Sequence, residues 1–384
     1  MNTNTDLKKS GNAIICVVGA RPNFMKMAPI MSAFATGPES ITAVLVHTGQ
    51  HYDEAMKDTF FKQLGIPEPD IDLEVGSGTH AVQTAEVMKR FEPVLDEYNP
   101  KAILVVGDVN STIACALVAV KKGIPVIHVE AGLRSGDRAM PEEINRVLTD
   151  QISDFLFLTE ASARDNLVGE GIDTDKIHFT GNVMIDTLIH QKKQAKPSGE
   201  TIKERLGDIA LDHCSKGYAV LTMHRPSNVD DESTLTGLLN TICEISNDLP
   251  VVFTVHPRTD AMMDKFGLKQ KLELMDNIFM VPPLPYQELL GLMADATLVL
   301  TDSGGLQEET TALGVPCITL RENTERPITV DQGTNTIVGT DRDKILSTSK
   351  AVLAGEGKAG RVPELWDGKA AYRIKEVLLD WMNG

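Results

Sequence analysis

The sequence predicts an α/β fold of two Rossmann-like lobes with a cleft between them, each lobe built on a mostly parallel sheet covered by helices. Two observations lead to this prediction. Short apolar runs alternate with amphipathic stretches along almost the whole chain of 384 residues, which is the pattern of buried parallel strands joined by helices. The alternation is interrupted once, at residues 189–202, by a polar stretch containing the turn formers Pro197, Ser198 and Gly199.

The apolar runs give the expected strands in order. In the first lobe they are residues 13–18, 41–47, 102–106, 125–129, 155–158 and 177–179, and in the second lobe 218–222, 251–255, 278–281, 297–301 and 317–320. We expect helices in the stretches between them. The interruption indicates a first domain at residues 1–190, a second at 191–368, and a final helical segment at 369–384.

Composition excludes several classes of function. The formal net charge of -17 argues against a general affinity for nucleic acid or for anionic membranes, because both require a basic surface. The 5 cysteines lack metal-type spacing and fit packing positions in a reducing compartment. Because the sequence has neither a signal-peptide pattern nor an apolar stretch of spanning length, we expect a cytoplasmic protein.

Acidic side chains follow two neighbouring expected strands of the first lobe. Glu130 comes directly after the run 125–129, and Asp108 follows the run 102–106. Ligands of open α/β sheets bind outside the carboxyl ends of the strands, so carboxylates at these positions are candidates for proton transfer. Glu142, at the start of the next helix, would bring a third acid. Crowded carboxylates shift one another's protonation, which separate acid and base duties require.

Each of these acids also has a structural interpretation. A helix start rich in Glu is favoured by the helix macrodipole. Asp108 could cap a helix that begins near Ser111. Glu142 and Arg146 are one helical turn apart, so they could form an ion pair that serves only the fold.

A loop with basic residues follows the first expected strand. Gly19 allows a tight turn there, and Arg21 and Lys26 then stand near a helix start, where an anion is already favoured. The alternative is a loop whose basic residues are merely solvated. The three spaced glycines of the dinucleotide-binding fingerprint are absent, so a nicotinamide or flavin dehydrogenase is not expected.

In the second lobe, two expected strands end in histidine and arginine. His224 and Arg225 follow the run 218–222, and His256 follows the run 251–255. Both sets would direct polar donors into one crevice. A single such histidine is also a common packing residue, but two strand ends with the same pattern favour a binding site.

The segment after residues 297–301 is the sharpest signal of the second lobe. Adjacent glycines at a helix start, Gly304 and Gly305, let backbone N–H groups approach phosphate oxygens, and Ser303 can cap the helix or donate. Glu309, one turn into that helix, is placed to accept from ribose hydroxyls, and Arg326 in a later loop supplies a cation. Helix capping alone would explain Ser303 but not the paired glycines.

Metal binding has little support, because the sequence lacks His-Glu-x-x-His and paired-cysteine spacing. The pairs Asp70 and Asp72, and Asp341 and Asp343, have the spacing seen in metal-dependent glycosyltransferases, but they sit in turn-like contexts. We expect both pairs to be surface acids.

Together these segments resemble the non-hydrolysing UDP-N-acetylglucosamine 2-epimerases, from about residue 14 to residue 340. Four motifs in this order and spacing carry the resemblance: Gly19-Ala20-Arg21-Pro22 with Lys26, and residues 128–134, 141–146 and 301–309. The resemblance implies a fold similar to the two-domain B-type glycosyltransferases, with UDP held mainly by the second lobe and the final helix packed back on the first. It also implies a homodimer that works without metal or other cofactor.

The resemblance further implies reversible interconversion of UDP-N-acetylglucosamine and UDP-N-acetylmannosamine, which supplies cell-surface polysaccharide synthesis. The C2 proton leaves as the C1–O bond to UDP breaks, and a bound glycal is reprotonated on its opposite face before UDP adds again. Asp108, Glu130 and Glu142 would be the acid/base group, with His224 assisting near the diphosphate. The implied substrate contacts are Arg21, Lys26, Arg146, Arg225, His256, Ser303, Gly304, Gly305, Glu309 and Arg326.

Two alternatives to this activity remain open in the sequence. Relatives that act on UDP-2,3-diacetamido-glucuronate are similar enough to leave the sugar's C3 and C6 substituents undecided. A B-type glycosyltransferase would use the same architecture with an added acceptor.

The chain departs from one pattern of the family. Many bacterial members that are activated by UDP-N-acetylglucosamine carry Arg after the Gln-His that matches Gln50 and His51, and Arg-Glu after the His-Arg that matches His224 and Arg225. Here those positions hold Tyr52 and Pro226-Ser227. We therefore expect no activation by substrate.

Overall fold

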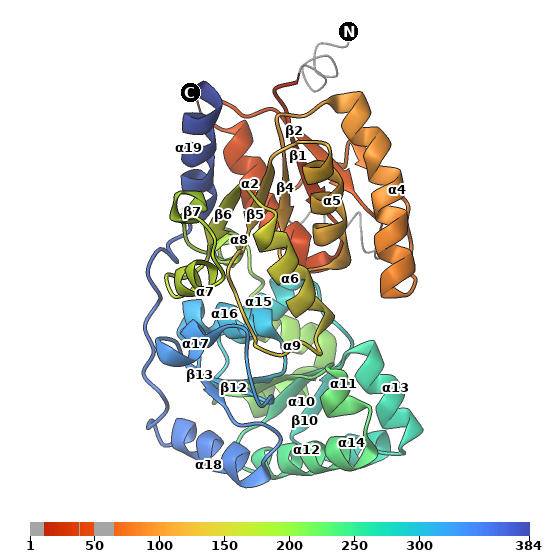
Figure 1. Cartoon of the computed structure of the whole chain (residues 1–384). Coiled ribbons are helices and arrows are strands. Elements are labelled where there is room, and N and C mark those ends of the chain that lie inside the picture. Colours follow the sequence, from red (N-terminus) through yellow and green to blue (C-terminus); the bar gives the residue numbers. More distant parts are fainter. Residues whose placement is uncertain (1–10, 38, 50–64) are drawn as a thin grey trace. The chain divides into compact units, whose positions relative to one another are not determined.

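The chain forms two compact units, which the computed structural model describes over residues 11–37, 39–49 and 65–384 (Figure 1). Unit 1 comprises Met1–Thr187 together with Glu364–Gly384, and unit 2 comprises Leu188–Pro363. Both units are α/β with parallel sheets, so the predicted fold class is confirmed. In the part of the chain that the structure describes, every helix is too short or too polar to cross a membrane.

Unit 1 contains, in its described residues, a 7-stranded parallel sheet in the order β3-β2-β1-β4-β5-β6-β7. The strands are β1 Ile14–Val18, β2 Ala43–His47, β3 Ile71–Asp72, β4 Ala102–Val106, β5 Val126–Val129, β6 Phe155–Leu158 and β7 Ile177–Phe179. The helices are α2 Arg21–Ala35, α4 His80–Tyr98, α5 Asn110–Lys121, α6 Pro141–Gln151, α7 Ala163–Gly169, the 3₁₀ turn Thr174–Lys176, the start of α8 Val183–Lys192, and α19 Ala370–Asn383.

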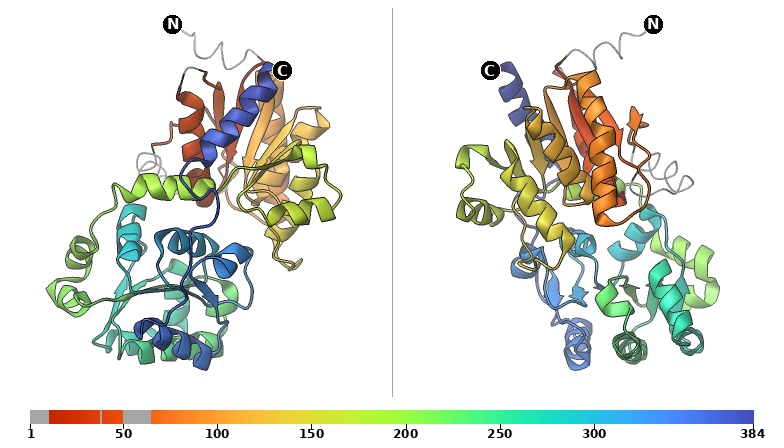
Figure 2. Two further views of the ribbon diagram at one scale, coloured as in Figure 1. Left: turned by 90° about the vertical axis from the view of Figure 1, so that its left-hand side faces the viewer. Right: turned by 45° about the vertical axis from the view of Figure 1, so that its right-hand side comes forward.

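The sheet of unit 1 is buried on both faces. Side chains alternate across a strand, so Ile15 and Val17 of β1 join one hydrophobic cluster with Val87 and Phe91 of α4. Helices α4 and α5 cover this face, and α2 and α19 lie on the other side of the sheet (Figure 1). Figure 2 shows α19 running beside α2. Burial on both faces explains why the strands read as continuous apolar runs rather than as alternating ones.

Unit 2 contains a 6-stranded parallel sheet in the order β10-β9-β8-β11-β12-β13. The strands are β8 Ala219–Thr222, β9 Val251–Thr254, β10 Ile278–Val281, β11 Leu298–Thr301, β12 Cys317–Thr319 and β13 Asn335–Ile337. The helices are the end of α8, α9 Ser198–Leu206, α10 Asp208–Cys214, α11 Pro226–Val229, α12 Glu232–Ile245, α13 Pro257–Lys265, α14 Lys269–Glu273, α15 Tyr286–Ala294, α16 Gly304–Leu313, α17 Pro327–Asp331 and α18 Arg342–Leu353.

Every strand expected from the sequence is present, with ends that differ from the expected ones by no more than about two residues. Two further strands, β3 and β13, lie at sheet edges and were not expected. They are short and contain polar residues, so they lack the apolar run by which a buried strand is recognised.

Asp70 is exposed and Asp72 is partly exposed, in keeping with the expectation of surface acids, but both carboxylates also make structural contacts. Oδ2 of Asp70 accepts a hydrogen bond from the backbone N–H of Leu45 at 2.9 Å. Oδ2 of Asp72 lies 2.9 Å from Nδ1 of the buried His47. Both carboxylates therefore connect the edge strand β3, or the residues just before it, to strand β2.

The chain passes from unit 1 to unit 2 inside helix α8, at Thr187 and Leu188, rather than in the polar stretch that follows. It returns at Glu364. The returning segment is anchored within unit 1, because Asp186 accepts from the backbone N–H groups of Ala370 at 3.1 Å and Ala371 at 2.8 Å. Burial raises the pKa of Asp186 to about 6, and these two hydrogen bonds only partly offset that rise.

Candidate active site

Two acids of unit 1 stand at the carboxyl ends of adjacent strands. Strands β4 and β5 pair in register, with Val106 opposite Val129. Glu130 follows β5 directly and is buried, and Asp108 follows β4 by two residues. Glu130 has φ 74°, the left-handed region that side chains other than glycine rarely adopt. Such strain persists only where the surroundings impose it, and it is concentrated at functional sites.

Lys26 of α2 supplies the cation for Glu130. The two side chains form an ion pair, and both are almost completely buried. A Cβ at Gly107 would lie 3.1 Å from Nζ of Lys26, so a larger residue after β4 would crowd the ammonium group. The left-handed φ of 67° at Gly107 also favours glycine. Gly107 therefore allows the lysine to reach the end of β5.

Arg146 of α6 holds Asp108. Its Nη2 donates to Oδ2 of Asp108 at 2.5 Å, and its Nη1 donates to Oε2 of Glu143 at 2.6 Å. Glu143 also accepts from the backbone N–H groups of Ser135 at 3.0 Å and Gly136 at 2.9 Å. Burial opposes ionisation of Glu143, but these donors and Arg146 outweigh it and lower the pKa of the carboxyl group.

These contacts rule out two structural interpretations of the acids. Arg146 pairs with Glu143 and Asp108, so the suggested ion pair with Glu142 is wrong. Val109 occupies the N-cap position of helix α5, and no side chain caps the helix from that position, so Asp108 is not its N-cap residue. Glu142 lies in the first turn of α6, is partly exposed, and has no hydrogen-bond or ion-pair partner among the described residues.

The side chain of Arg21 lies outside the described part of the structure, although its backbone begins helix α2. Tyr52 also lies outside the described residues. Gly19, just before α2, has a clear steric role: a Cβ there would lie 2.4 Å from Oγ of Ser111. Glycine therefore lets the loop after β1 approach the start of α5 closely.

In unit 2, His224 is held by Asp302. Nδ1 of His224 lies 2.9 Å from Oδ1 of Asp302, which is fully buried. Asp302 also accepts from the backbone N–H groups of His224 and Arg225 and from Nδ2 of Asn228. Burial opposes ionisation of Asp302, but the contacts with His224 and these N–H groups lower its pKa below the usual value. The carboxylate therefore directs Nδ1–H of His224 inward and leaves Nε2 for a ligand.

His256 lies beside His224, with ring centroids 5.2 Å apart. Nδ1 of His256 accepts from the backbone N–H of Arg258 at 3.2 Å at the start of α13. Burial, and then the neighbouring His224, lower the pKa of His256, so its ring is neutral near pH 7. Nε2–H is then a neutral donor. Two imidazoles thus lie together at the ends of strands β8 and β9.

Helix α16 begins with the two glycines singled out in the sequence. Ser303 is the N-cap residue, but its side chain makes no capping hydrogen bond. A Cβ at Gly304 would lie 2.5 Å from Oε1 of Glu325, whereas a Cβ at Gly305 would meet nothing within 4 Å. The absence of a side chain at Gly304 therefore lets Glu325 lie against the helix start, and Gly305 leaves the backbone open there. The free N–H groups of this helix start favour an anion.

Three arginines surround Glu325 near this helix start. Oε2 of Glu325 lies 2.9 Å from Nη2 of Arg321, and Oε1 lies 3.8 Å from Nη2 of Arg225. Burial opposes ionisation, but Arg326 and Arg321 outweigh it and lower the pKa of Glu325 to about 2. Within the described residues, the buried donors Nε of Arg225, Nη1 of Arg321 and Nε2 of Gln307 have no hydrogen-bond partner. Unsatisfied buried donors around a helix N-terminus suit an oxyanion such as a diphosphate.

The remaining two predicted contact residues are buried in unit 2. Nε of Arg326 lies 3.1 Å from Oε1 of Glu308. Oε1 of Glu309 accepts from the hydroxyl group of Tyr286 at 2.9 Å. Each of these charged side chains is thus oriented by a buried partner.

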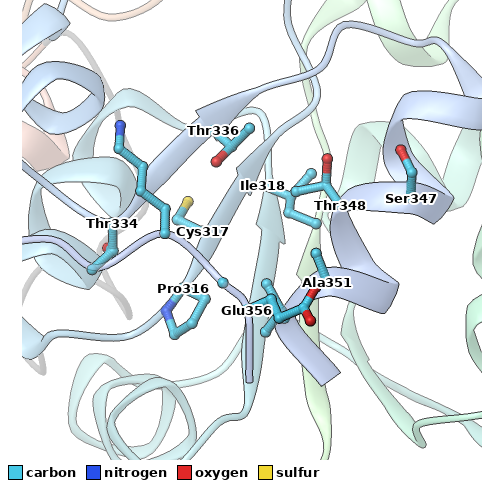
Figure 3. A pocket seen from close by; sticks show the side chains of 12 residues that line it. Pro316, Cys317, Ile318, Thr334, Thr336, Ser347, Thr348, Ala351 and Glu356 are labelled. Carbon is cyan, nitrogen blue, oxygen red and sulfur yellow. The ribbon is translucent and has the colours of Figure 1, made fainter. Parts of the chain in front are cut away.

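A cavity of about 360 Å³ lies elsewhere in unit 2 (Figure 3). It is lined by the start of β12, at Pro316 and Cys317, and by Thr348 and Ala351 of α18. Substrates of α/β folds bind at the carboxyl ends of the strands, so this cavity is not part of the candidate site. Among the described residues, no group of three His, Cys, Asp or Glu side chains could hold a metal ion.

Sequence reasoning missed several residues that position the candidate site. They form hydrogen bonds or ion pairs with the loops and side chains of the site, and they are Asn23, Glu143, Asp150, Asp302, Arg321 and Glu325. Glu143 and Asp302 lie inside the recognised motifs, next to residues that were singled out. A search for a second ionisable group beside each candidate would have found these two.

Comparison with known proteins places the chain among nucleotide-sugar enzymes. The family model for UDP-N-acetylglucosamine 2-epimerase matches residues 35–379. A UDP-N-acetylglucosamine 2-epimerase of Methanococcus maripaludis is 42% identical over 90% of this chain and 95% of its own length. A UDP-2,3-diacetamido-2,3-dideoxy-D-glucuronate 2-epimerase of Pseudomonas aeruginosa is 39% identical over 95% of this chain and 99% of its own.

Solved structures agree with this family. The Methanocaldococcus jannaschii UDP-GlcNAc 2-epimerase in complex with UDP-GlcNAc and UDP superposes with a TM-score of 0.82 at 41% identity, covering 96% of this chain and 99% of that one. A lipopolysaccharide outer core galactosyltransferase, at 12% identity and a TM-score of 0.53, shares the fold. The chain belongs to the UDP-N-acetylglucosamine 2-epimerase family.

Proposed function

We propose that this chain catalyses the reversible C2 epimerisation of UDP-N-acetylglucosamine to UDP-N-acetylmannosamine. The observation that carries the proposal is the pair of acids at adjacent strand ends: Asp108 with Arg146, and Glu130 with Lys26. Two carboxylates held in fixed orientations in unit 1 are suited to removing a proton from a carbon atom and returning one to it. Glu142, which is partly exposed, is the third acid of this proposal.

In the proposed first half-reaction a carboxylate takes the C2 proton, the C2–H electron pair forms the C1–C2 double bond, and the C1–O bond to UDP breaks. The products are a 2-acetamidoglucal and UDP, both held by the protein. In the second half-reaction another acid protonates C2 on the opposite face, and UDP adds again at C1. Atoms and electrons balance without an external oxidant or reductant.

Unit 2 would bind and stabilise the departing diphosphate. The start of helix α16 at Gly304 and Gly305 offers backbone N–H groups, and the unsatisfied nitrogens of Arg225 and Arg321 offer charge-assisted donors. His224, oriented by Asp302 through Nδ1, would act as an imidazolium whose Nε2–H donates to the leaving oxygen as negative charge builds on it. The remaining members of the proposed contact set are Arg21, His256, Ser303, Glu309 and Arg326.

The elimination step can be tested with positional isotopes. UDP-N-acetylglucosamine carrying ¹⁸O in the bridge between C1 and the β-phosphorus should scramble the label into the non-bridging β-phosphate positions, because freed UDP rotates before it adds again. Phosphorus NMR detects this exchange. Epimerisation without scrambling would argue against a free UDP intermediate, and release of free N-acetylmannosamine would indicate a hydrolysing enzyme.

The relative from Pseudomonas aeruginosa supports a second candidate, epimerisation of a UDP-diacetamido-glucuronate. The two substrates differ at C3 and C6, so kcat/KM measured for both decides between them. A preference of more than about tenfold, or 1.4 kcal/mol, would assign the substrate.

We further propose that the protein is a cytoplasmic homodimer whose product supplies cell-surface polysaccharide synthesis. Light scattering during size-exclusion chromatography should give twice the chain mass of 41.8 kDa. A mass equal to one chain at micromolar concentration would contradict the dimer.

A further inference from the structure

His128 is a buried histidine of unit 1 to which the proposed reaction assigns no step. It lies in β5, two residues before Glu130, and its side chain has no exposed surface. Nδ1 lies 2.7 Å from Oδ1 of Asp150 in α6, and Nε2 lies 2.8 Å from the carbonyl oxygen of Gly107. Both ring nitrogens therefore face oxygen atoms.

The partners of Asp150 determine which atom donates. Oδ2 of Asp150 accepts from the backbone N–H of Gly132 at 3.1 Å and lies 2.8 Å from Nη1 of Arg134. Arg134 is in turn held by Glu170 through bonds of 2.8 Å from Nε and 2.6 Å from Nη2. Asp150, facing a guanidinium group and a backbone N–H, is a carboxylate, and Nδ1 of His128 donates to it.

The carbonyl oxygen of Gly107 can only accept, so Nε2 of His128 donates as well. An imidazole that donates from both nitrogens is an imidazolium. The charged groups around it then alternate in sign: Glu170 negative, Arg134 positive, Asp150 negative, His128 positive. Pairing of each charge with its neighbour is the condition under which buried charges are tolerated.

This chain of contacts reaches both loops that carry the acids. Gly107 directly precedes Asp108, and Gly132 follows Glu130 by two residues. Gly107 and Glu130 both have left-handed backbone, with φ of 67° and 74°. Glycine adopts this conformation without strain, but at Glu130 it persists only when outside contacts hold the loop. His128 and Asp150 supply these contacts within unit 1.

We propose that His128 is a positioning residue: by donating to Gly107 on one side and to Asp150 on the other, it fixes the loops of Asp108 and Glu130 at the separation that proton transfer at C2 requires. This inference rests on the proposed epimerisation, because it gives the two acids their roles. His128 itself touches no reacting atom.

The protonation of His128 is tested in the wild-type protein. With ¹⁵N-labelled histidine, two-bond ¹H–¹⁵N spectra in the buffer of the activity assay should show a hydrogen on both ring nitrogens of His128, as the oxygen atoms at 2.7 Å and 2.8 Å require. The variant His128→Gln identifies the signals by their loss. A ring nitrogen of His128 that carries no hydrogen would overturn the imidazolium, and this result does not depend on any enzymatic activity.

The positioning role is tested by kinetics. His128→Gln keeps one amide donor but turns an oxygen toward either Gly107 or Asp150, so kcat should fall about 100-fold, since small displacements of reacting groups have such effects. KM and the affinity for UDP should stay within about threefold, because UDP is proposed to be held mainly by unit 2. A kcat within about threefold of wild type, or a change confined to KM, would overturn the proposal.

The chain offers a matched control in the same sheet. His47 of β2 forms a similar pair with Asp72, 2.9 Å between Nδ1 and Oδ2, but that pair joins two strands at the sheet edge. His47→Gln should leave kcat within about threefold. Equal loss in both variants would indicate general destabilisation and contradict a specific role. If wild-type protein epimerises none of the UDP-sugars tested, the proposed function fails, whereas the NMR result still decides the state of His128.

Discussion

Nη2 of Arg146 lies 2.5 Å from Oδ2 of Asp108, although the two residues are 38 positions apart in the chain. The same guanidinium group holds Glu143 through Nη1 at 2.6 Å. One side chain thus fixes a loop acid against a helix acid. Its planar fork makes this possible, because the two nitrogens point at two different carboxylates at once.

Arg146→Lys should therefore lower kcat by about 100-fold, because a lysine ammonium is a single point charge that cannot keep both carboxylates in place. The affinity for UDP, measured by calorimetry, should change less than about threefold. A variant that loses UDP affinity while it keeps kcat would show that Arg146 serves binding instead.

Asp302→Asn should reduce kcat by about 100-fold or more, because the amide presents N–H where His224 and the backbone N–H groups of the same loop need an acceptor. Asp230→Asn is the control, since Asp230 forms an exposed pair with Arg258 at 2.5 Å in the same unit. We expect the control to keep its kcat. Similar losses in both variants would argue that Asp302 has no specific role.

Gly304→Ala should weaken UDP binding by about tenfold or more, because the new Cβ would lie 2.5 Å from Oε1 of Glu325. Glu325 would have to move, and the three arginines around it would move with it. Gly237→Ala is the control: it adds a Cβ in helix α12 that meets nothing within 4 Å. Fluorescence or calorimetric titration with UDP measures both. Unchanged affinity in the first variant would remove the start of α16 from the proposed phosphate site.

Asp186 should make the docking of α19 dependent on pH. Burial raises its folded-state pKa to about 6, above the ordinary aspartate value of about 3.9, so the folded state binds the proton more tightly than the unfolded state. Asp186 therefore contributes to the free energy of unfolding at low pH. This contribution falls as the pH rises from about 4 through about 6, by at most about 3 kcal/mol in total.

Both tryptophans, Trp366 and Trp381, lie in the docked segment, so their fluorescence during urea unfolding reports it. Unfolding at pH 5 and pH 7.5 should show a larger pH effect for wild type than for Asp186→Asn. Equal pH effects in both proteins would contradict this assignment.

Pro226 and Ser227 depart from the pattern that the resemblance implies for substrate-activated members, and Pro226 begins the short helix α11. Initial rates should therefore follow a hyperbola in substrate concentration, with a Hill coefficient of about 1. A sigmoidal curve, or a lag removed by added UDP-N-acetylglucosamine, would contradict this expectation.

The strands could be predicted from sequence because each central strand is buried on both faces and reads as an unbroken apolar run. Strand β3 could not, since its two residues, Ile71 and Asp72, owe their conformation to pairing with β2 and to the bond between Asp72 and His47. The boundary between the units lies inside α8, where no local composition change marks it.

The candidate acids could be predicted from their places after β4 and β5, because the carboxyl ends of parallel strands meet at one edge of the sheet. The sequence could not predict that Arg146 pairs with Glu143 rather than with Glu142. The two glutamates differ by one position, about 100° around the helix, and only the helix orientation selects between them. The bond between His224 and Asp302 joins residues from two separate strand ends in unit 2.

The central claim is that acids of this chain exchange the proton at C2 of a UDP-sugar. Incubation with UDP-N-acetylglucosamine in deuterated water measures this directly, by proton NMR and mass spectrometry of the recovered nucleotide sugars. The account predicts deuterium at C2 in both epimers, and loss of that exchange in Asp108→Asn with UDP binding retained. Absence of exchange with every UDP-sugar tested, in folded protein that binds UDP, would contradict it.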